Sequence, residues 1–181
     1  AAKLGIQQIP PLTFAAARVL TALILISPLL ISTQIWKFIS QPKLIGFSLL
    51  LTANIVLFIL GIGQTTLAMD AMLYTLTPLL TIMASHFLYN EKLTTTKIVG
   101  IILGLLGACI IILTPVISPD GIYVGTLSGN LIILAAVMGF SLYTILSKRA
   151  QNRFSPLILT LTFLITATIV SLPLALVQHG L

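Results

Sequence analysis

The run IVGIILGLLGACIIILTPVI, at residues 98–117, decides the fold class of this chain. It holds no charged residue, and about 20 apolar residues are what an α-helix needs to cross the hydrocarbon core of a bilayer. Five further apolar runs flank it. The sequence therefore predicts an all-α integral membrane protein whose six transmembrane helices lie at Leu12–Ser32, Leu44–Gly63, Thr66–Leu88, Ile98–Ile117, Gly125–Ser147 and Pro156–Val177.

The composition of the whole chain agrees with a membrane protein. Of the 181 residues, 58% are hydrophobic and 7% are charged, against about 25% charged in an ordinary soluble domain, and the mean hydropathy is +1.18. The net charge of +6 comes from nine scattered Lys and Arg residues, so we assign it to orientation and not to nucleic-acid binding. Cys109 is the only cysteine, which excludes a disulfide framework and a multi-cysteine metal site. We expect no metal and no cofactor.

Basic residues alternate between the predicted connections. The loops after the first, third and fifth spans carry seven of them, whereas the opposite side carries only Lys3. Because Lys and Arg near span ends stay in the cytoplasm, both ends of this chain are expected outside. Trp36, Tyr89 and Tyr123 fall at predicted span ends, where aromatic rings prefer the headgroup level. The residues on the cytoplasmic side are Lys37, Lys43, Lys92, Lys97, Lys148, Arg149 and Arg153.

The first and sixth spans resemble each other at an offset of 145 residues. Pro11-Leu12 matches Pro156-Leu157, and Pro28-Leu29 matches Pro173-Leu174. Because an odd number of spans separates the two starts, the second copy would cross the membrane in the opposite direction, and inverted repeats are typical of secondary transporters. The chain begins with Ala1 and not with Met, so we interpret it as a fragment, and the repeat offset predicts one missing helix before it and three after it.

Two ionisable residues fall inside predicted spans, where a charge costs about 2.5–3.5 kcal/mol at mid-depth. Arg18 is expected about 10 Å below the outer end of the first span, and Asp70 about 9 Å below the outer end of the third. At this similar depth the two side chains could form an ion pair. They form or gate a polar site in the outer half of the membrane, or they are a structural pair, or Arg18 extends to the headgroups.

The third span carries polar side chains along one helical face. This stripe consists of Asp70, Tyr74, Thr77, Thr81 and Ser85, spaced three or four residues apart. Lipid does not favour such a face, so we expect it to point into the bundle, where it lines a substrate route or bonds neighbouring helices. Pro78 interrupts the same helix and frees backbone carbonyl groups, which is tolerated where they line a cavity, or it only kinks the helix.

Other residues within the spans have two interpretations each. His86 could relay protons or pack at the membrane interface. Asn130, Tyr143 and Thr144 could contact a substrate or hold helices together. A small-residue face on the fourth span predicts close helix packing, and it consists of Gly100, Gly104 and Gly107.

Catalytic motifs are absent from the sequence. It contains no His-Glu-x-x-His pair of the kind that binds catalytic zinc. The three acidic residues, Asp70, Glu91 and Asp120, are expected at different depths, which does not suit paired-carboxylate chemistry. We therefore predict that the protein is not an enzyme.

Residues Pro78–Leu93 form a Pro-containing apolar run that ends near Glu91, and the Gly-rich run Gly100–Gly107 follows it. The stretch Ile9–Arg18 places a proline pair before an arginine. Together these stretches resemble the EamA-like family of the drug/metabolite transporter superfamily, in its fourth, fifth and second helices. The family's glutamate maps to Glu91 and its arginine to Arg18.

This resemblance implies a ten-helix transporter of two inverted five-helix repeats around a central cavity, with both true termini in the cytoplasm. Residues 1–118 would be most of the first repeat, helices two to five, and residues 119–181 the start of the second, helices six and seven. Asn90 departs from the small residue expected before the family's glutamate. Asp70 matches no family position, so its role rests on its place in the span.

The predicted function is export of a small polar metabolite, such as an amino acid, by a secondary transporter of the bacterial plasma membrane that uses alternating access. The residues expected along the pathway are Arg18, Asp70, Tyr74, Thr77, Pro78, Thr81, Asn130 and Tyr143. Proton coupling and a homodimer stay open. The alternative is a non-transporting membrane subunit or assembly factor whose polar faces bind partner helices.

Overall fold

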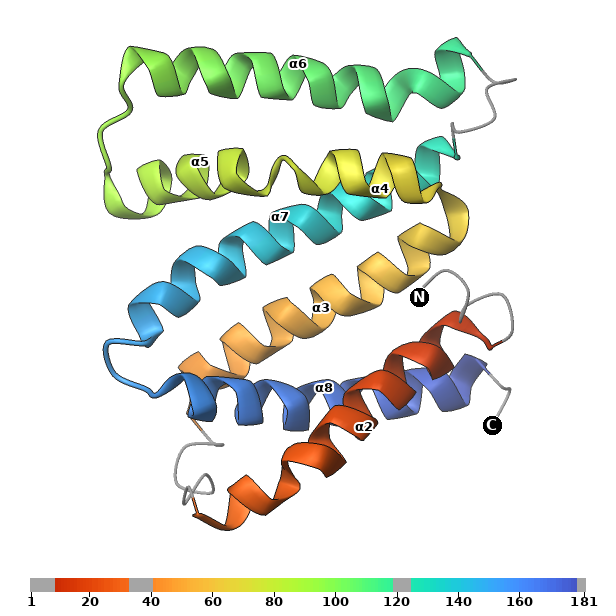
Figure 1. The fold of residues 1–181 in the computed structure, drawn as a ribbon, viewed down its shortest axis with the longest axis vertical. Coiled ribbons are helices and arrows are strands. Elements are labelled where there is room, and N and C mark those ends of the chain that lie inside the picture. The colour runs from red at the N-terminus through yellow and green to blue at the C-terminus, as the bar shows by residue number, and fades with distance from the viewer. Residues whose placement is uncertain (1–8, 33–40, 119–124, 179–181) are drawn as a thin grey trace.

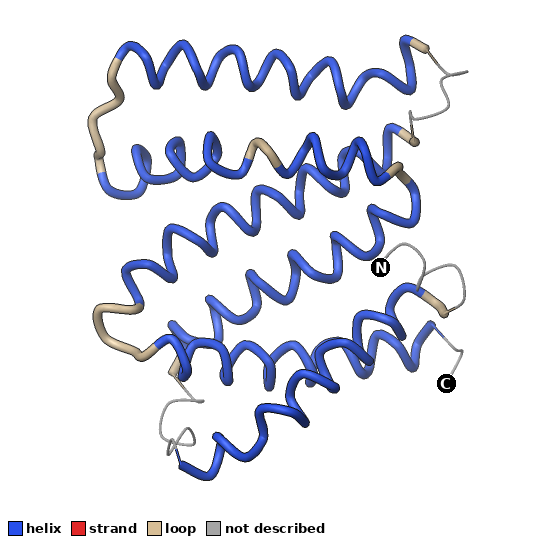
Figure 2. Tube along the Cα trace, viewed as in Figure 1, coloured by secondary structure: helices blue, strands red, loops and turns tan. Residues whose placement is uncertain are grey.

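The computed structural model describes residues 9–32, 41–118 and 125–178 (Figure 1). Six residues that entered the sequence argument lie outside these ranges: Ala1, Lys3, Trp36, Lys37, Asp120 and Tyr123. Within the described ranges the chain is helical apart from short turns and connections, and those ranges contain no strand (Figure 2).

The described ranges hold seven helices, which form six candidate membrane spans. The helices are α2 (Pro11–Ser32), α3 (Pro42–Gln64), α4 (Leu67–Tyr74), α5 (Thr77–Tyr89), α6 (Thr95–Ile117), α7 (Leu127–Ala150) and α8 (Pro156–Gln178). Six segments are long and apolar enough to cross a membrane, with α4 and α5 together counting as one. The prediction of an all-α protein with six spans is confirmed.

Threonine side chains cap the starts of α4 and α7, and Thr94 caps α6 in the same way. The hydroxyl of Thr66 accepts a hydrogen bond from the backbone N–H of Met69 at 3.2 Å, and the hydroxyl of Thr126 accepts one from Gly129 at 3.0 Å. These N–H groups have no partner inside their own helix. A threonine just before the helix therefore stabilises the start of α4 and of α7.

The helices α3 and α7 pack against each other in opposite directions at the centre of the bundle (Figure 1). The backbone N–H of Thr126 donates to the carbonyl of Gln64 at 3.0 Å, so the end of α3 meets the start of α7. At the other end, Leu44 of α3 and Ala150 of α7 belong to one buried cluster. The helices α4, α5 and α6 lie on one side of this central pair, and α8 and α2 lie on the other.

The helices α2 and α8 also run in opposite directions. The backbone N–H of Leu12 donates to Oε1 of Gln178 at 3.0 Å, which joins the start of α2 to the end of α8. Each helix contains an internal proline, Pro28 in α2 and Pro173 in α8. These are the two spans that match at an offset of 145 residues, and their opposite directions are compatible with an inverted repeat.

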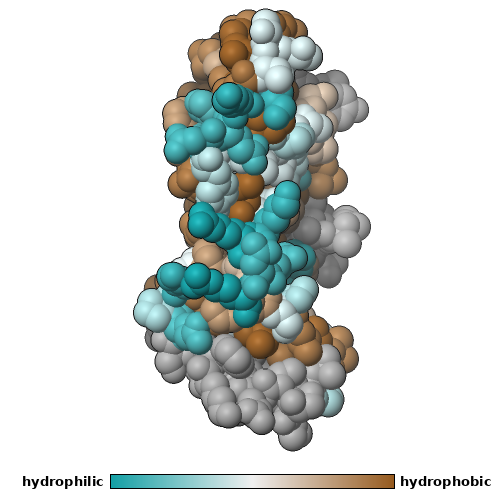
Figure 3. Space-filling model, turned by 90° about the vertical axis from the view of Figure 1, so that its left-hand side faces the viewer, coloured by the Kyte–Doolittle hydropathy of each residue, from teal (hydrophilic) through white to brown (hydrophobic). Residues whose placement is uncertain are grey.

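Most described Lys and Arg residues gather at one end of the bundle, which we call the basic end. It is formed by the start of α3, the connection from α5 to α6 and the connection from α7 to α8. Figure 3 looks at this end, and hydrophilic side chains form a band across it. Among the described basic residues, Arg18 alone lies elsewhere. The basic end carries Lys43, Lys92, Lys97, Lys148, Arg149 and Arg153.

The predicted glycine face of α6 makes close contact at one position. A Cβ at Gly104 would overlap the Leu79 side chain of α5. A Cβ at Gly100 or Gly107 would meet nothing within 4 Å. Within the described residues, the close packing expected of this face therefore occurs at Gly104, whereas much of α6 exposes apolar side chains, as a lipid-facing helix does.

The start of α7 approaches the end of α3 too closely for any side chain at position 129. A Cβ on Gly129 would lie 2.8 Å from the carbonyl carbon and oxygen of Gln64. We expect Gly129→Ala to lower the free energy of unfolding by about 1 kcal/mol, because the two backbones must separate. Unfolding by SDS in mixed micelles measures this. Gly63→Ala is the matched control, because its Cβ would meet nothing within 4 Å; an equal loss in both variants would contradict the argument.

Candidate functional site

The third span is broken between α4 and α5. The α4 helix ends at Tyr74 and α5 begins at Thr77, and the linking residues Thr75 and Leu76 keep right-handed helical backbone angles, so the two helices continue in line (Figure 1). Pro78 accounts for this break, because it has no N–H to donate to the Tyr74 carbonyl and its ring crowds that carbonyl. The hydroxyl of Thr77 donates to the Tyr74 carbonyl at 2.7 Å instead. This carbonyl is therefore satisfied by a side chain of its own span.

Next to the break, the side chain of Asn54 joins three helices. Its Nδ2 donates to the hydroxyl of Tyr74 on α4 at 3.1 Å and to the carbonyl of Ala136 on α7 at 2.8 Å. The ring of Phe58 meets the Tyr74 ring edge to face, with 5.8 Å between the ring centroids. We call this hydrogen-bonded group the Asn54–Tyr74 centre. It is a buried polar contact, since Asn54 is 7% exposed, and Asn54 lies in the middle of the candidate span Pro42–Gln64.

Asn54 is missing from the residues that the sequence predicted for the site. A signal for it existed, since it is a single amide in the middle of the apolar span Leu44–Gly63. An amide at that depth is costly unless it finds a partner. Applying the same cost argument to amides as to charges would therefore have placed Asn54 among the candidates.

Asp70 lies one turn before Tyr74 on α4 and has a shielded carboxylate oxygen. Its Oδ1 makes no hydrogen bond with any described residue and is inaccessible to solvent. Most buried polar atoms in proteins are hydrogen-bonded, and an unpaired carboxylate is especially costly within a membrane. Among the described residues, Asp70 is therefore the strongest candidate for binding a proton, a cation or a polar ligand.

Arg18 does not reach Asp70. The helix α2 packs on α8 and α3, whereas α4 packs on α7 and α6, so the two residues lie on opposite sides of the central pair (Figure 1). Arg18 is exposed, and its guanidinium carbon lies 5.8 Å from the centroid of the Phe14 ring one turn earlier. The ion pair that equal depth suggested is not formed between these described residues, because equal depth does not make two helices neighbours.

The other hydroxyl groups of the predicted stripe lie on α5. The hydroxyl of Thr81 donates to the carbonyl of Thr77 at 2.7 Å within the same helix. The hydroxyl of Ser141 on α7 donates to the carbonyl of Val137 at 2.8 Å and lies 3.3 Å from the Thr77 carbonyl. Ser85 is buried, and its hydroxyl makes no hydrogen bond with the described residues. The hydroxyl groups of the stripe on α5 thus bond mainly to backbone carbonyls. The two residues of the stripe whose side chains can gain or lose a proton, Asp70 and Tyr74, lie on α4.

The two candidates on α7 have different surroundings. Asn130 is fully buried, accepts a hydrogen bond from the Thr65 hydroxyl at 2.5 Å and donates through Nδ2 to the carbonyl of Ile111 at 3.3 Å. Both the oxygen and the nitrogen of the Asn130 side chain are thus bonded to residues outside α7, which favours a role in helix contact over a role in substrate contact. Tyr143 is half-buried, and its ring stacks on Phe140 with 6.5 Å between the centroids.

The end of α5 explains the conformation of the residues around Glu91. Nδ1 of His86 lies 2.7 Å from the carbonyl oxygen of Glu91, and since a carbonyl only accepts, Nδ1 carries the hydrogen. Asn90 has φ of 53°, the left-handed conformation that often ends a helix. Asn tolerates this conformation better than most residues. Asn90, in place of the small residue that the resemblance predicted, therefore suits the turn. No group of three metal-binding side chains occurs in the described ranges.

These features define a multi-pass membrane protein with a carboxylate and a hydrogen-bonded amide inside its spans. Residues 1–113 match the EamA-like transporter family, and the chain belongs to this family. It is 32% identical over 118 residues to a protein described as the uncharacterized transporter YetK of Bacillus subtilis (strain 168). The match covers 65% of this chain and 36% of YetK, so the chain spans about a third of that relative's length. No solved structure matches the chain.

Proposed function

We propose that the chain forms part of a secondary transporter that exports a small polar metabolite, such as an amino acid, across the bacterial plasma membrane by alternating access. The observation that carries this proposal is the shielded, unpaired carboxylate oxygen of Asp70. It lies one turn from the Asn54–Tyr74 centre, in a span that is broken into two helices. Membership of the EamA-like transporter family supports the class of function. In this proposal Asp70 binds the substrate or a coupling proton.

The proposed whole protein has ten helices in two inverted five-helix repeats. Residues 1–118 supply most of the first repeat and residues 119–181 supply the start of the second. The opposite directions of α2 and α8, whose sequences match at a fixed offset, support this arrangement. The basic end faces the cytoplasm, in keeping with the retention of Lys and Arg on that side.

Reconstitution of the full-length protein into liposomes tests this function. We expect efflux of at least one metabolite from a labelled panel above the level of protein-free liposomes. The rival function, a non-transporting subunit or assembly factor, is favoured by the use of Asn130 in helix contacts. It predicts stable copurification with other membrane proteins and no flux. That pair of results would contradict the transporter proposal.

A further inference from the structure

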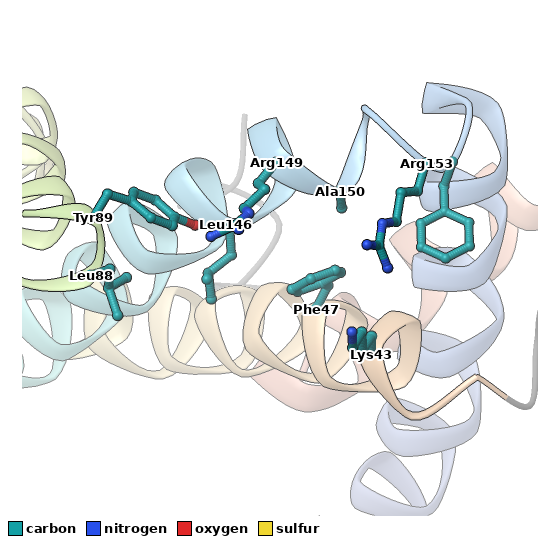
Figure 4. Close-up of a pocket in the computed structure, with 9 residues that line it drawn as sticks. Lys43, Phe47, Leu88, Tyr89, Leu146, Arg149, Ala150 and Arg153 are labelled. Carbon is teal, nitrogen blue, oxygen red and sulfur yellow. The ribbon is translucent and has the colours of Figure 1, made fainter.

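A cavity at the basic end lies at the opposite end of the third span from Asp70. Its volume is about 420 Å³, within the range of roughly 300–1,000 Å³ that is usual for small-molecule sites. It lies among the start of α3, the end of α5, the end of α7 and the connection to α8 (Figure 4). Three cationic side chains line it, together with three aromatic rings. The cations are Lys43, Arg149 and Arg153, and the rings are those of Phe47, Tyr89 and Phe154.

No carboxylate lines this cavity in the described part of the chain. The sequence has three acidic residues. Asp70 lies in α4, in the other half of the third span, and Asp120 lies outside the described residues. Glu91 lines a separate cavity of about 280 Å³, which it shares with Lys148 and Arg149. The three cations of the larger cavity therefore have no acidic neighbour within it.

Like charges that face one cavity repel each other, and apolar walls strengthen the repulsion because they lower the local dielectric constant. The same walls strengthen the attraction for an anion. A single carboxylate would neutralise one of the three cations. A phosphate group brings several negatively charged oxygens into the same space, so it balances the positive charge of the cavity better than a carboxylate does.

Two of the cationic side chains face each other across the cavity, and the third is turned toward Tyr89 (Figure 4). Arg149 lies over the Tyr89 ring, with its guanidinium carbon 5.2 Å from the ring centroid, and this contact restrains it. Figure 4 shows Arg153 extending from the connection between α7 and α8 toward Lys43 at the start of α3. Guanidinium groups bind phosphate oxygens through paired hydrogen bonds, and lysine adds a point charge.

We propose that this cavity binds a phosphate group, carried either by a soluble anion or by the headgroup of an anionic lipid. Lys43 and Arg153 supply charge from opposite walls, and Arg149, held beside Tyr89, adds a third positive charge to the lining. The proposal does not depend on transport, because the proposed substrate contact, Asp70, lies at the other end of the span.

Thermal unfolding of the full-length protein in phosphatidylcholine nanodiscs tests the soluble source. Inorganic phosphate should raise the unfolding temperature in a saturable way, and chloride at equal ionic strength should not. Lys43→Gln and Arg153→Gln should each weaken the apparent phosphate affinity about tenfold. Lys97→Gln is the matched control: it removes the same charge at the start of α6, lines neither cavity and should leave the affinity unchanged.

Nanodiscs that contain phosphatidic acid test the lipid source. If the headgroup fills the cavity, phosphatidic acid should raise the unfolding temperature of the wild type more than that of either variant, and inorganic phosphate should add nothing. Arg153→Lys keeps the charge and should retain binding, which separates lost binding from lost folding. No response in either arm would overturn the proposal. An equal loss in Lys97→Gln would also overturn it, because the response would then be a general effect of surface charge.

Discussion

Asp70→Asn is expected to reduce metabolite efflux from liposomes about tenfold or more, since a hydrogen bond to a charged group is worth about 1.5–3 kcal/mol. Asparagine has the shape of aspartate, but it can neither carry a negative charge nor accept a proton at its side chain. The Oδ1 atom of Asp70 has no partner among the described residues, so the substitution removes no internal hydrogen bond at that atom. Insertion and the free energy of unfolding should therefore be preserved or slightly improved.

Thr81→Val provides the control for this experiment. Thr81 belongs to the same predicted stripe, but its hydroxyl bonds to the carbonyl of Thr77 in its own helix. Efflux by Thr81→Val should stay close to that of the wild type. Normal efflux by Asp70→Asn would remove Asp70 from the mechanism. An equal fall in both variants would show that efflux responds to general damage of the span.

The membrane spans were predictable because each one is a long apolar run, and the sequence records length and polarity directly. The break in the third span was predictable in kind, since Pro78 cannot donate to the carbonyl four residues before it. The residue at which the helix stops was harder to predict. The helix stops at Tyr74, several residues before the proline, because the crowded carbonyl belongs to that residue. A stripe calculated for one continuous helix therefore joined residues of two separate helices.

Neighbour relations between helices could not be predicted. Counting residues gives the depth of Arg18 and of Asp70, but it does not tell which helices touch, and α2 and α4 lie on opposite sides of the central pair. Asn130 shows a second limit. A buried amide looks the same in the sequence whether it binds a substrate or a neighbouring helix, and only the contacts to Thr65 and Ile111 favour the helix role.

Asn54→Leu is expected to lower the free energy of unfolding by about 2–3 kcal/mol, because each of its two hydrogen bonds contributes about 1–1.5 kcal/mol. Leucine has a similar size but donates to neither the Tyr74 hydroxyl nor the Ala136 carbonyl, and these bonds connect α3 to α4 and to α7. Unfolding by SDS in mixed micelles measures the loss. The expected loss exceeds that of Gly129→Ala, since two interhelical bonds disappear together.

A double-mutant cycle separates the Asn54–Tyr74 bond from the general effect of removing an amide. Tyr74→Phe alone deletes one acceptor and should cost about 1 kcal/mol. The double variant should then cost about 1 kcal/mol less than the sum of the single variants, because both single changes break the same bond. Strict additivity would show that Asn54 and Tyr74 do not act together. A positive coupling would mean that this bond holds α4 in place, and α4 is the helix that presents Asp70.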